Sequence, residues 1–320
     1  MASQLDLARS ILKQEHQTLD IQKEVGLDDY VRNLIDSNLY TTLNIQFDGF
    51  KVKVIFISDN DTKVVSFPSY TDDAYYDFCS HLFELKKDEK YNFSNSKIID
   101  GIRTRIFAIM PPLTKFPDIT ISTTKIPPTM LNKQTIPDEI FNKIIHSNFM
   151  IIGGSGSGKT YLFNYLLNKF INPNERIALI EEFGELIPPN ELTTQIIVPP
   201  PKPGQDSLLQ FITQQSNLMR LNSIYLGEIK GGEAWPMIIN MASGTKGGFT
   251  MHGEDEKQAL SRLRALCKMG CDSISEDIID EFISKSLNYI IVMDHHNIKN
   301  IFKLTGTHIK NNFTLQEINS

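Results

Sequence analysis

The most constraining feature of the chain is the segment GGSGSGKT at residues 153–160, which directly follows the apolar run at 149–152. The segment matches the pattern GxxxxGK[ST] of phosphate-binding loops. In such a loop, a buried strand leads into a glycine-rich turn whose backbone N–H groups face phosphate oxygens, and a helix then begins with its positive end toward the same anion. The apolar spacing of residues 161–167 predicts that helix. The sequence therefore predicts a binding site for a nucleoside triphosphate.

The fixed positions of this segment have distinct expected roles. We expect Lys159 to reach the β- and γ-phosphates and the Thr160 hydroxyl to bind Mg²⁺, while the preceding backbone amides surround the phosphates. A chance glycine-rich turn is the alternative, but it would need neither a strand before it nor a helix after it. The residues predicted to contact the nucleotide are Gly154, Ser155, Gly156, Ser157, Gly158, Lys159 and Thr160.

The composition is that of a globular protein with enough residues for two cores. The chain has 320 residues, of which 41% are hydrophobic and 22% charged, and its formal net charge is −6. Single cores rarely grow past about 250–300 residues, so two domains are expected. The acidic balance gives no support to a nucleic-acid partner. The sequence suggests no signal peptide and no apolar run long enough to span a bilayer, so we expect any membrane contact to be peripheral.

The first third of the chain has the pattern of an α+β domain with antiparallel strands. Apolar residues alternate on both sides of Asp48-Gly49, which is a strong hairpin signal. A proline-rich stretch at residues 126–137 then predicts a linker. The elements expected before the linker are helices within 4–35 and at 72–86, and strands at 44–47, 50–56, 64–67, 103–110 and 118–123.

Beyond the linker the pattern changes to alternating strands and helices. Such alternation predicts a mostly parallel sheet covered by helices on both faces, which is an α/β fold. Ligands of these sheets lie at the carboxyl ends of the strands, where the phosphate loop is also expected. The expected strands are 148–152, 176–181, 223–227 and 248–251, and the expected helices are 159–170, 207–219, 231–243 and 256–268.

Polar residues follow three of these strands. Glu181 and Glu182 end one of them, and burying such acids is costly unless a cation meets them, as Mg²⁺ beside a triphosphate would. A solvated loop acid is the plainer interpretation, and it suits Glu185 better than Glu181. Glu228 ends the next strand in the manner of a Walker B carboxylate, which binds Mg²⁺ directly or through water. His252 ends a short glycine-flanked strand, where it could sense the γ-phosphate.

Four segments, taken in order, resemble the motifs of a known family. GGSGSGKT, RIALIEEFGEL, LGEIKGGEA and SGTKGGFTMH are similar to the Walker A, Asp-box, Walker B and His-box motifs of the secretion "traffic" ATPases, and most similar to the type IV secretion and conjugation branch. The resemblance is clear from residue 101 to residue 269 and holds only in kind for residues 1–100. It implies a RecA-like P-loop NTPase domain at 138–320 and a smaller α+β N-terminal domain at 1–125 that closes over the nucleotide.

The resemblance also implies roles for single residues. Glu181 would be the general base for the attacking water, with Glu182 left open for the same role. Glu228 would organise Mg²⁺, and Arg103 would reach the triphosphate from the N-terminal domain. His252 matches the last histidine of the His box. The expected catalytic set is Glu181, Glu228, Lys159, Arg103 and His252.

Several positions depart from the family pattern, among them Leu221-Asn222, where Pro-Asp is common. Glu182 stands where an aspartate is usual, and Thr245 stands where the first histidine of the His box is expected. Lys125 stands in place of a second arginine of the N-terminal domain. Lysine cannot make the bidentate contact that arginine makes with phosphate, which argues against a finger role for Lys125.

The function implied by the resemblance is that of a motor with ATP and Mg²⁺ as cofactors. It would be a homo-oligomer, a hexameric ring, that hydrolyses ATP to drive translocation or assembly in a type IV secretion or conjugation system. It would work in the cytoplasm with inner-membrane proteins of that machine, at the inner face of the membrane, and without sequence-specific nucleic-acid binding. Two alternatives remain: a motor of type IV pili or type II secretion, and a nucleotide switch that does not turn over.

Overall fold

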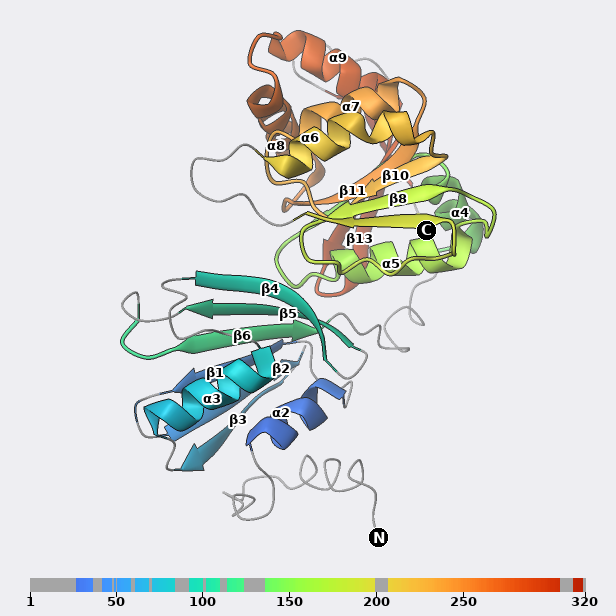
Figure 1. Cartoon of the computed structure of the whole chain (residues 1–320). Helices are drawn as coiled ribbons and strands as arrows, with labels where there is room; N and C mark the ends of the chain where they lie inside the picture. Colours follow the sequence, from blue (N-terminus) through green and yellow to red (C-terminus); the bar gives the residue numbers. More distant parts are fainter. Residues whose placement is uncertain are drawn as a thin grey trace. The chain divides into compact units, whose positions relative to one another are not determined.

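The computed structural model separates the chain into two compact units, Met1–Pro127 and Pro128–Ser320 (Figure 1). Each unit has its own apolar core. Among the helices that the structure describes, none has both the length and the apolar character needed to cross a bilayer. The helices expected before residue 27 lie outside the described residues. The residues described are 27–36, 42–47, 49, 51–58, 61–68, 71–83, 92–99, 102–109, 114–123, 136–198, 207–305 and 313–318.

In its described residues, the first unit is an antiparallel sheet with two helices. Its strand order is β3-β2-β1-β6-β5-β4, and the expected hairpin around Gly49 joins β1 to β2. Gly49 has a φ of +95°, and a Cβ at this position would lie 2.8 Å from the ring of Phe116, so glycine is required. The sequence pattern does not predict β4. The elements are α2 (Leu27–Asp36), β1 (Thr42–Phe47), β2 (Lys51–Ser58), β3 (Asp61–Pro68), α3 (Asp72–Phe83), β4 (Asn92–Ile99), β5 (Ile102–Ile109) and β6 (Asp118–Thr123).

One face of this sheet packs against both helices. Leu43, Ile45 and Phe47 are buried and alternate with half-buried residues along β1, which gives the strand one apolar side. The other side is polar, and Asn44 donates a hydrogen bond to Asp118 on β6 over 2.6 Å. The hydrophobic alternation of β1 thus sets the register of this sheet.

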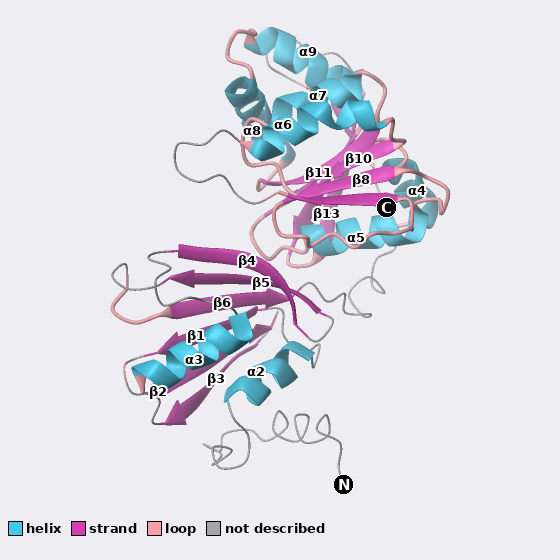
Figure 2. Cartoon of the chain, viewed as in Figure 1, coloured by secondary structure: helices cyan, strands magenta, loops and turns pink. Residues whose placement is uncertain are grey.

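The described part of the second unit contains an eight-stranded, mostly parallel sheet in the order β14-β13-β12-β7-β11-β10-β8-β9. The strands from β12 to β9 are parallel to their neighbours, while β13 and β14 are antiparallel. In β7, Phe149 and Ile151 belong to one apolar cluster while Met150 and Ile152 belong to another. The core therefore lies on both faces of the sheet, and helices cover both (Figure 2). The predicted α/β class is confirmed.

Most elements predicted beyond the linker are present, although residues 216–219 form a separate 3₁₀ helix. The sequence pattern does not predict α4, β9, α9, β12, β13 or β14. The elements are α4 (Asp138–Ile145), β7 (Asn148–Gly153), α5 (Lys159–Phe170), β8 (Ile177–Glu181), β9 (Thr193–Ile197), α6 (Leu208–Gln215), β10 (Ser223–Leu226), α7 (Ala234–Ala242), β11 (Lys246–His252), α8 (Glu256–Gly270), α9 (Glu276–Ser286), β12 (Tyr289–Asp294), β13 (Asn297–Leu304) and β14 (Leu315–Glu317).

An ion pair joins α8 to α9 and leads to a prediction about stability. Arg264 Nε lies 2.5 Å from Asp280 Oδ1, and Arg264 Nη2 lies 2.6 Å from Oδ2. The side chain of Asp280 is fully buried. Replacing Arg264 with leucine would leave this carboxylate without its counter-charge, so we expect the free energy of unfolding of the second unit to fall by about 3 kcal/mol.

Urea denaturation followed by tryptophan fluorescence measures this loss. The single tryptophan of the chain, Trp235, packs edge-on against Phe282 of α9 with 5.5 Å between the ring centroids, so it reports on the same helix. Lys257→Ala, an exposed change on α8, is the control and should leave the unfolding midpoint unchanged. An Arg264→Leu protein as stable as that control would show that the ion pair contributes nothing.

Candidate nucleotide-binding site

The phosphate-loop segment forms the expected connection between a strand and a helix. β7 ends at Gly153 and α5 begins at Lys159, with all of β7 buried. Gly156 and Gly158 have φ values of +71° and +91°, a region that side chains rarely adopt. Gly158 is also the N-cap of α5, so the first N–H groups of that helix open toward the loop. The loop therefore has the backbone geometry that an anion site needs.

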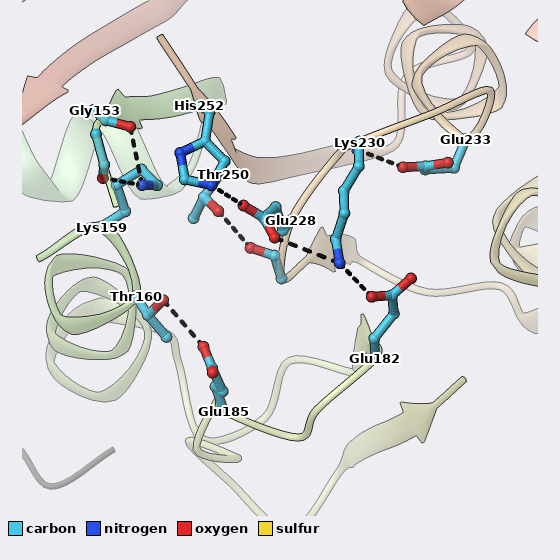
Figure 3. Close-up of polar contacts among 12 residues, drawn as sticks. Gly153, Lys159, Thr160, Glu182, Glu185, Glu228, Lys230, Glu233, Thr250 and His252 are labelled. Atoms are coloured by element: carbon cyan, nitrogen blue, oxygen red, sulfur yellow. Dashed lines mark hydrogen bonds and ion pairs between the residues drawn. The ribbon is translucent and has the colours of Figure 1, made fainter. Parts of the chain in front are cut away.

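Lys159 lies over this loop (Figure 3). Its Nζ donates to the carbonyl of Gly153 over 3.0 Å and to that of Gly154 over 2.6 Å, and the residue is 8% exposed. Burial lowers the pKa of Lys159, while the charges of Glu228 and Glu185 act to raise it. An ammonium that is costly to bury gains stability from any anion placed beside it.

Thr160 on α5 faces an acid from the connection after β8. Its Oγ1 lies 3.4 Å from Oε2 of Glu185 (Figure 3). Asn164, one turn further along α5, fixes this connection by donating to the Glu185 carbonyl over 3.0 Å and accepting from the Ile187 N–H over 2.8 Å. Glu185 is thus held beside the phosphate loop, although the sequence suggests a solvated loop acid.

Glu181 ends β8, as predicted, but protein donors occupy its carboxylate. Oε2 accepts from the N–H of Glu185 over 2.5 Å and from that of Leu186 over 3.0 Å, and Oε1 accepts from the Gln195 side chain over 2.9 Å. The residue is 4% exposed, and this burial raises its pKa. The carboxylate of Glu181 therefore shapes the loop that carries Glu185.

Glu228 follows β10 and lies between two cationic or polar partners (Figure 3). Its Oε1 is 3.0 Å from Nε2 of His252, and its Oε2 is 3.7 Å from Nζ of Lys230. Gly227 before it has no room for a side chain, since a Cβ would lie 2.8 Å from Cβ of Glu181. Thr250 on β11 donates to the Gly227 carbonyl over 2.6 Å, which fixes the start of this loop.

His252 stands opposite Gly153 in the pairing of β11 with β7, so it reaches the phosphate loop directly. Burial lowers the pKa of His252 below its usual range, and Lys159 and Arg262 lower it further. Glu228 and a hydrogen bond with the Gly153 backbone oppose this shift. We therefore expect a neutral imidazole at neutral pH.

This shift predicts how stability depends on pH. The unfolded chain takes up a proton on His252 near its ordinary pKa of about 6.5, whereas the folded chain does so only at lower pH. The neutral form of His252 therefore costs the folded state no stability above pH 6.5. As the pH falls below 6.5, the unfolded chain takes up the proton more readily, and the free energy of unfolding decreases. We expect His252→Gln to lose less stability than the wild type between pH 7.5 and pH 5.5, as measured by urea denaturation. A wild-type slope in His252→Gln would refute the assignment.

Lys230 is a member of the site that the sequence reasoning missed. Its Nζ contacts a carboxylate oxygen of Glu182 and lies 5.2 Å from the centre of the Phe183 ring. The sequence feature that could have indicated Lys230 is its position, two residues after Glu228.

The structure brings Lys159, Thr160, Glu228 and His252 together with Glu185 at one edge of the sheet. Arg103 lies in β5, paired with Ile98, and its side chain falls outside what the structure describes. Lys125 lies outside the described residues.

Comparisons with known proteins show which family the chain belongs to. The family described as Type II/IV secretion system protein matches residues 129–301, which is more than half of the chain. The chain belongs to this family. The resemblance to the type IV branch of the secretion ATPases, drawn from the four motifs, is confirmed.

Individual relatives match parts of the chain. It is 28% identical over 151 residues to the protein VirB11 of Agrobacterium fabrum, which covers 46% of this chain and 44% of the relative. It is 35% identical over 106 residues to the uncharacterized protein MJ0781 of Methanocaldococcus jannaschii, which covers 32% of this chain and 15% of the relative. The matched region thus spans less than half the length of these relatives.

The fold of this family member also occurs in solved structures. The ATPase DotB of Legionella pneumophila superposes with a TM-score of 0.60 at 14% identity, over 94% of this chain and 84% of that one. At this level of identity the similarity concerns the fold, and it supports the predicted RecA-like ATPase architecture.

Proposed function

We propose that the protein is an Mg-ATP hydrolase that works as a hexameric motor in a type IV secretion or conjugation machine. The observation that carries the proposal is the meeting of Lys159 and Thr160, at the start of α5, with Glu185 and Glu228 at the carboxyl edge of the sheet. Membership of the type II/IV secretion family supports the cellular setting.

The residues at this edge fit a magnesium ion bound with a nucleotide. Thr160 offers a hydroxyl and Glu228 a carboxylate, which are the oxygen ligands that Mg²⁺ prefers. Within the described part of the chain, no group of three or more acids, histidines or cysteines is placed to hold an ion without further ligands. Magnesium is commonly held by one or two protein groups together with phosphates and water, so this sparse set suits it. When bound, the ion supplies neutralisation of phosphate charge.

The side chains and backbone amides at this site have separate roles in phosphoryl transfer. Lys159 and the amides of residues 154–158 neutralise charge on the transferred group, which is the main requirement of this reaction. His252, as a neutral donor, holds one oxygen of Glu228, and Thr160 and Glu228 orient the ion.

We assign the positioning of the attacking water to Glu185 rather than to Glu181 or Glu182. The carboxylate of Glu181 already accepts hydrogen bonds from two backbone N–H groups and Gln195. Glu182 contacts Lys230. Glu185 Oε2 lies 3.4 Å from the Thr160 hydroxyl, which places this carboxylate beside the phosphate loop.

The N-terminal unit completes the site in this proposal. Arg103 reaches the triphosphate when the units close, so hydrolysis is coupled to their relative motion, and six chains form a ring. Light scattering with Mg²⁺ and a non-hydrolysable ATP analogue tests the ring. Six copies of the 36.4 kDa chain would weigh about 220 kDa. A monomer under every condition would contradict a self-assembling ring.

A further inference from the structure

Lys230 stands on a rigid backbone rather than on a loose surface loop. Its N–H donates to Oε1 of Glu233 over 2.6 Å, and the N–H of Gly231 donates to the same oxygen over 2.8 Å. Glu233 is 3% exposed and precedes α7 directly. The direction in which the Lys230 side chain leaves the loop is therefore fixed by buried contacts.

The ammonium of Lys230 lies between carboxylates from two neighbouring strands. Glu182 follows β8 and Glu228 follows β10, and these strands pair with Leu226 opposite Ile180. The Glu182 side chain is 13% exposed, so its charge needs a partner, and Lys230 supplies one. The Phe183 ring lies beside the same ammonium, which favours a cation there.

Both oxygens of Glu228 are thereby held by different partners. Oε1 faces His252 at 3.0 Å and Oε2 faces Lys230 at 3.7 Å. The contact of Lys230 with Glu182 is the shorter of its two ion pairs. Lys230 is therefore anchored on Glu182 and acts at longer range on Glu228, the carboxylate assigned to Mg²⁺ (Figure 3).

We propose that Lys230 is a positioning residue that competes with Mg²⁺ for Glu228 and links that competition to the Glu182 loop. The inference rests on the proposed function, because it presumes Mg²⁺ at Glu228. A cation held by Glu228 would leave Glu182 as the carboxylate partner of the Lys230 ammonium. Cation binding at Glu228 thus strengthens the ion pair between Lys230 and Glu182. Glu182 lies in the loop after β8, which also carries Glu185.

The test measures the Mg²⁺ dependence of binding of a fluorescent, non-hydrolysable ATP analogue by anisotropy. Removing a positive charge a few ångströms from Glu228 should lower the Mg²⁺ concentration for half-maximal binding about fivefold in Lys230→Met. Glu182→Gln should raise it, because the ammonium then has Glu228 as its main partner. Lys230→Arg should stay close to the wild type. Lys246→Met removes an exposed charge at the opposite end of β11 and should change nothing.

The double variant that combines Lys230→Met with Glu182→Gln distinguishes this linkage from independent effects of the two charges on Mg²⁺ binding. Independent charge effects would add, whereas a linked set predicts that Glu182→Gln has a much smaller effect once Lys230 is methionine. Circular dichroism and thermal unfolding of each variant confirm that it is folded. Additive effects, or a Lys230→Met protein with wild-type Mg²⁺ dependence, would overturn the inference while leaving the proposed function standing. A folded wild-type chain that binds the analogue without any Mg²⁺ dependence would overturn both.

Discussion

Replacing Glu185 with glutamine is expected to lower the turnover number for ATP hydrolysis by about a hundredfold or more, with nucleotide affinity unchanged. A positioned carboxylate that accepts a proton or orients water typically contributes about 10²–10⁴-fold. Glutamine retains an oxygen that can accept from Thr160 Oγ1, so the loop geometry should persist. Steady-state phosphate release and anisotropy of a fluorescent nucleotide measure the two quantities.

The matched change at Glu181 should give a different result. Its carboxylate accepts from the N–H groups of Glu185 and Leu186 and from Gln195, so an amide NH₂ would face donors. We expect Glu181→Gln to lower the free energy of unfolding by about 1–3 kcal/mol, because buried donors lose their acceptors. Glu191→Gln, an exposed acid of the same connection, serves as the control. A stable Glu181→Gln protein without turnover, beside a fully active Glu185→Gln protein, would restore Glu181 as the base.

Replacing Lys159 with methionine is expected to remove both tight nucleotide binding and turnover. Hydrogen bonds to charged groups contribute about 1.5–3 kcal/mol, so affinity for ATP should fall at least tenfold. Turnover should fall by about 10³-fold, because the same charge stabilises the transferred phosphoryl group. Calorimetric titration with an ATP analogue and phosphate release measure these losses.

We expect the Lys159→Met protein to keep most of the free energy of unfolding of the wild type. Burial already lowers the pKa of Lys159, which means that its charge is held at a cost. Methionine fills a similar volume without that cost, so the free energy of unfolding should not fall by more than about 1 kcal/mol. Lys169→Met, on the exposed end of α5 where the lysine pairs with Asp138, is the control for charge removal. Wild-type ATP affinity in a folded Lys159→Met protein would contradict the placement of this residue in the site.

The parts of the fold that the sequence predicts are those with strong local patterns. The phosphate loop is recognisable because glycine spacing, a buried strand and a helix start all lie within about twenty residues. The position of β11 between β7 and β10 depends on contacts between distant segments, so no local pattern predicts it. Edge strand β9 is harder still, since TTQII is only half buried and lacks a strong apolar signal.

In the site, too, the sequence predicts the features that depend on local patterns and not those that depend on contacts between distant segments. The sequence places acids after the strands β8 and β10, and Glu228 meets His252 at that edge of the sheet. It cannot distinguish Glu181 from Glu185, because the difference lies in which carboxylate accepts the N–H groups of a folded loop. The bridging position of Lys230 likewise depends on the pairing of β8 with β10.

The most direct test of the central claim is phosphate release by the full chain in the presence of ATP and Mg²⁺, with the Lys159→Met protein and an EDTA-treated sample as controls. The arrangement of Lys159, Thr160, Glu185 and Glu228 predicts release of many phosphates per chain, lost in both controls. Tight ATP binding without release beyond one phosphate per chain, in a protein assembled into its ring, would contradict a motor and point to a nucleotide switch.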